Sequence, residues 1–504
     1  MFNDSILMNG GTPYMFNLKF FIMKKGIKLF VLVLLPLIGI TQTVDWKICY
    51  GGSDEERAFE IIPSHDGNFL LAGNTKSVDG DISFNHGSSD YWVVKIDDSG
   101  GILWEETYGG TNFERAHSIL GTNDGAYLIA GQKNLIDGNP TNSDFYLVKF
   151  NESGTILWEN TYGGSAFDIP YDIVRSPDDN YFVSGVTSSD DGDVSGNESN
   201  KSAVWVMKMN ASGTILWEKC YLINDCVNFG ASVPTPDNGL IFTADVCDDN
   251  SDFHIVRLDE EGEIIWQKTY GGSLNDFPHA IAKCYENSGY VVAGAAASND
   301  GDLFGNNGSF DFWVIKIDHE GELLSSNCYG GSDPDKAYSV LAHGNSEILV
   351  AGVTESDDGD TKNEDDFGDF WIINTAYDGT LNWQISLGDS IGREVATSII
   401  PAGDESFLVA GYTCSQEGQV VTGHHGMVDY WLVKINTTGN STENITVSGN
   451  VDISPNPTSS YLNLIGEDIK FVELVNISGV IIANFIENPQ QLNLSGFHKG
   501  LYFL

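Results

Sequence analysis

A recurring Tyr-Gly-Gly step constrains the fold of this chain more than any other feature. It closes the stretch over residues 100–110, which reads G-G-I-L-W-E-E-T-Y-G-G. The tyrosine position is occupied, at intervals of 49 to 59 residues, by Tyr50, Tyr108, Tyr162, Tyr221, Tyr270 and Tyr329, with Leu387 in a seventh copy. A period of this size predicts a repeat architecture.

Each repeat contains four short strand patterns separated by turn residues. In the first copy they cover residues 58–63, 68–75, 90–97 and 101–108, and Asp66-Gly67 joins the first two as a hairpin signal. The third pattern is apolar at nearly every position, which is typical of a strand buried on both faces. We therefore expect each four-stranded sheet to be sandwiched between its neighbours.

Other repeated positions indicate how the sheets pack. The small pair Ala72-Gly73 of the second strand recurs and suits a close approach of two backbones. Trp92 and Trp104 represent repeated aromatic positions that predict packing between sheets, with carbohydrate stacking as the less favoured alternative. Lys95 represents a repeated basic position, which an internal salt bridge or a snorkelling side chain explains better than catalysis.

The seventh copy lacks its fourth strand. It runs through residues 396–401, 407–413 and 429–435 and reaches Gly439 without another Ile-x-Trp pattern. The missing pattern stands ahead of the first copy, where residues 44–50 read V-D-W-K-I-C-Y. An N-terminal strand that completes the last sheet closes a ring and removes its open edges. The sequence thus predicts an all-β, seven-bladed β-propeller over residues 43–439, because an open solenoid has no use for the displaced strand.

The N-terminal segment predicts export. Lys24, Lys25 and Lys28 precede the apolar run 29–40, the layout of a secretory signal peptide cleaved near Thr41 or Gln42. We assign residues 1–42 to this signal peptide and its leader, with Met1 or Met23 as the initiator. The alternative, a membrane anchor, needs about 20 apolar residues, and no later stretch provides them.

The charge of the chain narrows the class of partner. Acidic residues outnumber basic ones by 71 to 25, for a net charge of −46. Such a surface repels phosphate backbones, so nucleic-acid binding is not expected. Because 41% of the residues are apolar, the chain is expected to have a core rather than to be a disordered acidic polymer.

The C-terminal region carries several motifs in a fixed order. A polar linker over residues 440–450 precedes Pro455-Asn456-Pro457-Thr458, short alternating strands, the run L-N-L-S at residues 492–495 and the close G-L-Y-F-L at 500–504. Residues 451–504 therefore predict a small Ig-like β-sandwich. They resemble the C-terminal (type A) sorting domain of the Bacteroidetes type IX secretion system, and the repeats resemble propellers found ahead of such tails.

That resemblance implies recognition by the type IX secretion machinery, passage through the outer membrane and removal of the tail afterwards. We accordingly expect a secreted or cell-surface protein without a transmembrane helix after signal cleavage. Sorting domains of this kind continue past the Gly-x-Tyr-Phe-Leu strand to a basic end. The sequence is therefore either truncated at Leu504 or carries an incomplete signal.

The loop between the second and third strands repeats an Asp-Gly-Asp motif, here called the D-G-D loop. Calcium prefers six to eight oxygen ligands, and glycine permits a tight loop around it. Asp-Gly is equally a common solvated turn, and both interpretations stay open. The candidate calcium ligands are Asp79, Asp81, Asp191, Asp193, Asp300, Asp302, Asp358 and Asp360; related loops contain Asp137-Gly138-Asn139 and Glu417-Gly418-Gln419. No other cofactor is expected.

A second acidic set follows the Gly-Gly step and is expected to be a solvated rim. Its members are Asp54, Glu55, Glu56, Glu114, Asp168, Asp276, Asp333 and Asp335. A glycosidase would need a pair of carboxylates that breaks the repeat, and no such pair stands out. The sequence also lacks G-x-S-x-G, H-E-x-x-H and phosphate-loop motifs. No catalytic residue is assigned.

The cysteines indicate a structural role. Cys49, Cys220 and Cys328 precede the tyrosine position in different copies, too far apart to pair. Local bridges from Cys220 to Cys226 or from Cys247 to Cys284 are alternatives for an exported protein. The fourth copy, with Leu222-Ile223 in place of Gly-Gly, departs most from the repeat, through either specialised function or drift.

The sequence therefore favours a secreted or cell-surface binding or scaffold propeller without catalytic activity, and a glycan or protein as its extracellular ligand. The alternative is an enzyme that acts on extracellular polysaccharide or peptide, with its site on the propeller face near the fourth copy. The identity of the ligand is not encoded in any motif.

Overall fold

The computed structural model describes the residues 32–33, 41–134, 142–198, 201–223, 227–246, 250–285, 288–344, 346–361, 368–403, 405–415, 418, 420–439, 451–454, 461–466, 471–476, 481–486, 491–493 and 502–503. Several predicted features lie outside these ranges: the signal peptide and leader except residues 32–33 and 41–42, the linker 440–450, the Asp137-Gly138-Asn139 loop, Glu417, Gln419, Cys226 and Cys247. Contacts divide the chain into one unit of residues 42–438 and a second of residues 1–41 with 439–504.

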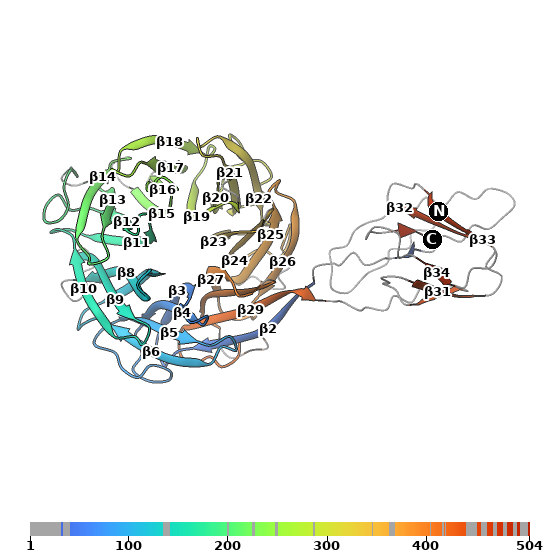
Figure 1. Ribbon diagram of the computed structural model, residues 1–504, viewed down its shortest axis with the longest axis horizontal. Helices are drawn as coiled ribbons and strands as arrows, with labels where there is room; N and C mark the ends of the chain where they lie inside the picture. The colour runs from blue at the N-terminus through green and yellow to red at the C-terminus, as the bar shows by residue number, and fades with distance from the viewer. Residues whose placement is uncertain are drawn as a thin grey trace. The chain divides into compact units, whose positions relative to one another are not determined.

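The first unit is a ring of seven four-stranded antiparallel sheets, as predicted (Figure 1). Blade 1 contains β3 (Glu56–Pro63), β4 (Phe69–Thr75), β5 (Asp90–Ile96) and β6 (Ile102–Tyr108), and blade 2 contains β7 (Glu114–Gly121), β8 (Ala126–Asn134), β9 (Ser143–Asn151) and β10 (Ile156–Tyr162). Blade 3 contains β11 (Asp168–Arg175), β12 (Tyr181–Thr187), β13 (Ala203–Met209) and β14 (Ile215–Tyr221), and blade 4 contains β15 (Val227–Pro234), β16 (Leu240–Val246), β17 (Phe253–Leu258) and β18 (Ile264–Tyr270). Blade 5 contains β19 (Asp276–Lys283), β20 (Tyr290–Ala296), β21 (Asp311–Ile317) and β22 (Leu323–Tyr329), and blade 6 contains β23 (Asp335–His343), β24 (Glu347–Thr354), β25 (Asp369–Ala376) and β26 (Leu381–Leu387).

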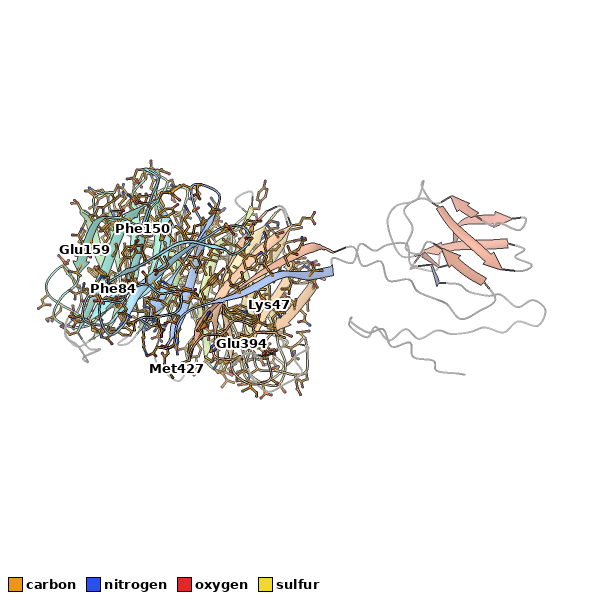
Figure 2. All side chains as sticks on the ribbon, turned by 90° about the horizontal axis from the view of Figure 1, so that it is seen from below. Lys47, Phe84, Phe150, Glu159, Glu394 and Met427 are labelled. Carbon is orange, nitrogen blue, oxygen red and sulfur yellow. The ribbon has the colours of Figure 1, made fainter. Side chains whose placement is uncertain are left out.

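Blade 7 closes the ring with a strand from the other end of the chain. Its sheet has the order β2-β29-β28-β27, in which β27 (Glu394–Pro401), β28 (Ser406–Thr413) and β29 (Asp429–Gly439) are joined by β2 (Thr41–Tyr50). Both figures show β2, in blue, beside the orange β29, and Lys47 of β2 is labelled there in Figure 2. The predicted closure by the N-terminal strand is confirmed.

The core lies between the blades. Every residue of β5 is buried, which agrees with a third strand covered on both faces. The aromatic residue after Asp429 illustrates the repeated contact: the Tyr430 ring lies 4.5 Å from the Trp92 ring, centroid to centroid, across the closure. Equivalent pairs join Phe145 to Trp205, Phe253 to Trp313, Phe312 to Trp371 and Phe370 to Trp431. The third-strand aromatics therefore hold adjacent sheets together, as predicted.

The repeated tyrosine makes a second contact between blades. The Tyr50 hydroxyl, from the sheet of blade 7, donates to the Gly100 carbonyl oxygen of blade 1 at 2.7 Å. The same bond runs from Tyr108 to Gly154, Tyr162 to Gly213, Tyr221 to Gly262, Tyr270 to Gly321 and Tyr329 to Gly379. Six of the seven blades are thus joined at the outer strand to a turn of the next blade, and blade 6, which has Leu387 at this position, is the exception.

The remaining repeated positions have the structural roles expected. A Cβ on Gly73 would lie 2.0 Å from the Arg57 carbonyl oxygen, so the second strand does approach a neighbouring backbone closely. The Lys95 ammonium is buried and pairs with Asp66 at 2.6 Å, the predicted internal salt bridge. Both alternative disulfides are absent from the structure, because Cys220 and Cys284 are free thiols.

The second unit has its own strands. One sheet has the order β1-β35-β32-β33, formed by β1 (Leu32–Val33), β35 (Tyr502–Phe503), β32 (Phe471–Asn476) and β33 (Ile481–Ile486). The other joins β30 (Val451–Ser454), β31 (Tyr461–Gly466) and β34 (Gln491–Asn493). Within the described ranges of the chain, no helix has the length and hydropathy to cross a bilayer.

Candidate functional site in the central channel

The inner strands of the seven blades surround a central channel of about 1220 Å³. Its walls are formed by β3, β7, β11, β15, β19, β23 and β27, which Figure 1 shows nearest the centre of the ring. The end at which these strands begin carries the Tyr-Gly-Gly steps and the D-G-D loops, and we call it the Gly-Gly face.

A β-bulge in every inner strand directs side chains into this channel. In β3 the register shifts between Ala58 and Glu60, so Phe59 has no partner residue on β4. A bulge re-aims the extra residue out of the normal alternation of a strand. The channel lining at the seven bulges consists of Phe59, His117, Tyr171, Gly230 with Ala231, His279, Tyr338 and Thr397. The channel is thus lined largely by aromatic rings.

In five blades the residue after the bulge forms a hydrogen bond to the next blade. The Glu60 carboxylate accepts a hydrogen bond from the Ile119 amide at 2.6 Å, and the Ser398 hydroxyl accepts one from Ile61 at 3.3 Å across the closure. Matching bonds join Ile173 to Ser118, Ser232 to Asp172 and Ile399 to Ser339. The inner edge of these strands would otherwise present unpaired N–H groups. Five of the interfaces are therefore closed by a side chain of the preceding blade.

Two of these positions carry carboxylates, and both line the channel. Burial, and after it the charge of Asp172, raises the pKa of Glu60 to about 8. Burial also raises the pKa of Asp172, against the hydrogen bonds that the carboxylate accepts from Ser232. Asp172 in addition accepts from the Ser118 hydroxyl at 3.2 Å. Both acids stand where other blades have serine, and neither stands out in the sequence as one of a pair.

Arginines gather where the channel opens on the Gly-Gly face. The Arg115 guanidinium lies 4.3 Å from the centre of the Phe59 ring, and that of Arg57 lies 5.3 Å from the centre of the Tyr412 ring. Burial, and after it the positive charge of Arg57, lowers the pKa of Arg115. Burial lowers the pKa of His117 to about 3 and that of His279 to about 4, so both imidazoles are neutral at pH 7.

The D-G-D aspartates are hydrogen-bonded to the Tyr-Gly-Gly steps. Asp79 accepts from the Ser53 amide at 2.8 Å, and Asp81 accepts from the Gly51 amide at 3.0 Å. The arrangement recurs with Asp191 and Asp193, Asp300 and Asp302, and Asp358 and Asp360. Gly80 has a φ of +69° and its Cβ would lie 2.2 Å from the Gly51 carbonyl oxygen, so only glycine fits there. These loops therefore hold the turns of the Gly-Gly face.

The structure brings each D-G-D pair together but does not bring the pairs of different blades together into one cluster. Within the described part of the chain, no three His, Cys, Asp or Glu side chains are grouped so that they would hold a metal ion. Calcium binding at these loops stays a prediction from the sequence.

The expectation of a solvated acidic rim is wrong for much of the second acidic set. Glu56, Glu114, Asp168, Asp276 and Asp335 are 0% exposed. Each accepts a hydrogen bond from the second glycine of its step, which at Gly52 and Glu56 spans 2.8 Å. A buried turn N–H needs an acceptor, and this need explains the acid four residues later. Asp54 and Asp333 of the same set are exposed.

The channel was missed because its residues do not resemble a motif. One signal in the sequence would have identified them: one position of the first strand holds a different, mostly aromatic residue in successive copies, as at Phe59, His117, Tyr171 and Tyr338. A variable aromatic position inside a regular repeat is a candidate for ligand contact rather than for packing.

Comparison with known families identifies the tail. The family model described as the secretion system C-terminal sorting domain matches residues 452–504. The predicted resemblance to a type IX sorting domain is thereby confirmed, and the chain is a propeller protein addressed to the cell surface or the exterior by the type IX secretion system. No curated protein matches the chain.

Solved structures with similar folds are distant in sequence. A protein of unknown function from Bacteroides caccae is 12% identical, with 66% of this chain and 94% of that chain covered and a TM-score of 0.37. The Pan2 WD40 domain of Neurospora crassa is 10% identical, with 80% and 97% covered and a TM-score of 0.46. Sqt1 from Chaetomium thermophilum is 12% identical, with 85% and 98% covered and a TM-score of 0.40.

Proposed function

From an exported seven-bladed propeller with a type IX sorting tail, we propose a non-catalytic binding protein whose ligand enters the central channel from the Gly-Gly face. The observation that carries this proposal is the aromatic lining produced by the bulges. The Phe59, His117 and Tyr171 rings follow one another around the wall, with centroids 5.7 and 5.1 Å apart. Tyr171 is 37% exposed. Aromatic side chains in a concave site supply large contact areas at low entropic cost.

The state of the channel carboxylates supports binding rather than catalysis. Glu60 and Asp172 occupy positions that serine fills in blades 2, 6 and 7, and all five side chains accept an amide proton of the next blade. Each carboxylate therefore has a structural role that serine performs elsewhere. A scaffold needs stable contacts between its blades, and this hydrogen bond supplies one at five of the interfaces.

The second candidate function is hydrolysis of an extracellular glycan or peptide. It is favoured by one observation, the elevated pKa of Glu60 beside Asp172. A carboxylic acid whose pKa is raised beside a second carboxyl group is the arrangement that general acid catalysis uses.

A screen of the purified protein against glycan and peptide libraries, scored for both binding and cleavage, separates the two functions. We expect binding without turnover, and we expect Tyr171→Ala to weaken it at least tenfold while Tyr285→Ala, an exposed tyrosine at 53%, leaves it unchanged. Turnover that disappears in Asp172→Asn, with an unchanged melting curve, would establish the enzyme instead.

A further inference from the structure

We infer that the channel mouth on the Gly-Gly face binds an acidic sugar, whose carboxylate or sulfate group is held by Arg115 and Arg57. This inference rests on the proposed binding function and specifies the chemical class of its ligand. The chain has five arginines. Burial raises the pKa of the Tyr412 phenol, and three of the five arginines, Arg57, Arg393 and Arg115, lie close enough to oppose that rise.

Arg115 has no acidic partner among the residues that the structure describes. Its Nε is buried and makes no hydrogen bond, and no described carboxylate forms an ion pair with it. Its guanidinium lies over the face of the Phe59 ring, 4.3 Å from the ring centre. A desolvated guanidinium without a counter-charge is costly, and acidic residues outnumber basic ones by 71 to 25 in this chain. The lack of a carboxylate beside Arg115 therefore indicates a binding site for an external anion.

The neighbouring cations strengthen this indication. Arg57 lowers the pKa of Arg115 through like charge, while its own ion pair, with Glu55, spans 3.9 Å between partly exposed side chains. Exposed ion pairs of this length contribute little. Two adjacent guanidiniums with little local compensation attract a carboxylate or a sulfate, with which arginine forms paired hydrogen bonds.

The rest of the mouth favours a sugar over an extended peptide. A peptide that added a strand would need free inner-edge amides, but those of Ile61, Ile119 and Ile173 are already bound by side chains. The mouth instead offers aromatic faces at Phe59, Tyr171 and Tyr338. Such rings pack against the apolar face of a pyranose, and their polar edges and hydroxyls suit its hydroxyl groups.

The test uses the purified protein and four probes of matched length: a uronic-acid oligomer, its neutral counterpart, a sulfated glucan oligomer and the unsulfated glucan. Calorimetry should show the charged member of at least one pair binding tenfold or more tighter than the neutral member, with affinity falling as salt rises. Whether the carboxylated or the sulfated oligomer binds identifies the source of the anion.

Two arginine variants localise the effect. Arg115→Gln should lose at least tenfold of the affinity for the charged oligomer. Arg175→Gln is the matched control, because Arg175 also lines the channel but ends its inner strand at the opposite end; it should stay within twofold of the wild type. Melting curves verify that both variants are folded, and Arg115→Lys serves in place of Arg115→Gln if the latter is not.

The outcomes distinguish this inference from the function on which it rests. If charged and neutral oligomers bind equally, and Tyr171→Ala but not Arg115→Gln weakens binding, the channel is a binding site and the acidic sugar is wrong. Binding of acidic peptides alone, or an equal loss in Arg175→Gln, also overturns the inference. If none of the probes binds in the channel, both the acidic-sugar inference and the proposed binding function are wrong.

Discussion

The acid at position 60 shows how one residue ties the chemistry of the channel to the stability of the ring. Its carboxyl group lies in the channel wall near Asp172 and accepts the amide proton of Ile119. Serine at the equivalent positions forms the same bond without a charge. A neutral Glu60 therefore suits the site better than an ionised one.

This preference makes stability depend on pH at Glu60. Its folded-state pKa of about 8 lies above the ordinary value of 4.5 for a glutamate side chain. The folded state therefore binds the proton more tightly, and the contribution to stability is complete below the unfolded pKa and is lost as pH rises through about 8. Each unit of pKa shift corresponds to about 1.4 kcal/mol.

We expect Glu60→Gln to be more stable relative to the wild type at pH 8 than at pH 5, because glutamine accepts the same amide proton without charge. Urea unfolding at both pH values measures the difference. The control is Glu320→Gln, at an exposed position, which should show none. If the wild type instead became more stable relative to Glu60→Gln between pH 5 and pH 8, the elevated pKa of Glu60 would be wrong.

The D-G-D aspartates stabilise the turns of the Gly-Gly face through hydrogen bonds. Asp358 accepts from the Ser332 amide at 2.7 Å, and loss of one such bond costs about 1 kcal/mol. Asp358→Ala should therefore lower the free energy of unfolding by about that amount in a calcium chelator.

Calcium is tested in the same experiment. If these loops bind calcium, which is one of the two interpretations of the sequence, millimolar Ca²⁺ raises the melting temperature of the wild type, since a ligand of the folded state stabilises it. The rise should shrink in a variant with Asp358→Ala and Asp360→Ala together. Identical melting curves in calcium and chelator would remove calcium from the loops and leave their hydrogen bonds as their role.

At the scale of the element, the tyrosine contact explains why Leu387, at the end of β26 in blade 6, replaces the repeated tyrosine. The acceptor is the carbonyl oxygen of a turn glycine with positive φ, such as Gly100 at +82°. In blade 7 the corresponding Gly439 ends the extended strand β29 instead of turning into a fourth strand. Leu387 therefore faces no such turn, and the one exception in the repeat follows from the displaced strand.

We expect Tyr50→Phe to destabilise the propeller by about 1 kcal/mol, because it leaves the buried Gly100 carbonyl without its donor. Chemical unfolding measures the change, and Tyr285→Phe, at a tyrosine that is 53% exposed, is the matched control. Equal stability of Tyr50→Phe and the wild type would show that the outer contact at the closure is dispensable.

At the scale of the molecule, the N-terminal strand decides whether the ring is closed. Strand β2 covers the edge of β29 and brings Trp46 and Ile48 against the core between blades 7 and 1. The inner strands make their own contact there, through Ser398 and Ile61. Closure is thus made at both the outer and the inner radius of the ring.

Deletion of residues 41–50 should expose the β29 edge and promote association, since open strand edges pair with other chains. Light scattering should detect oligomers, and unfolding should become less cooperative. A synthetic peptide of the β2 sequence should restore the monomer. A monomeric, fully stable deletion variant would show that three strands suffice in blade 7.

Much of this architecture follows from local pattern in the sequence. The period, the four strands of each copy and the strand missing from the seventh are properties of neighbouring residues, so blade number and closure were predictable. Unbroken apolar runs in the sequence predict the third strands, which are buried on both faces. The channel site could not be predicted in this way, because Phe59, Tyr171 and Tyr338 come from three separate blades and line one channel only when the ring closes.

The amino-acid sequence by itself determined the propeller, its closing strand and its export tail, because each depends on patterns within a few residues or on a fixed repeat. Tertiary structure alone decided that Glu56 and its equivalents are buried acceptors, that a bulge turns one residue per blade into the channel, and that Arg115 lacks a carboxylate. Burial and electrostatic environment depend on what the ring brings together, and no local pattern records that.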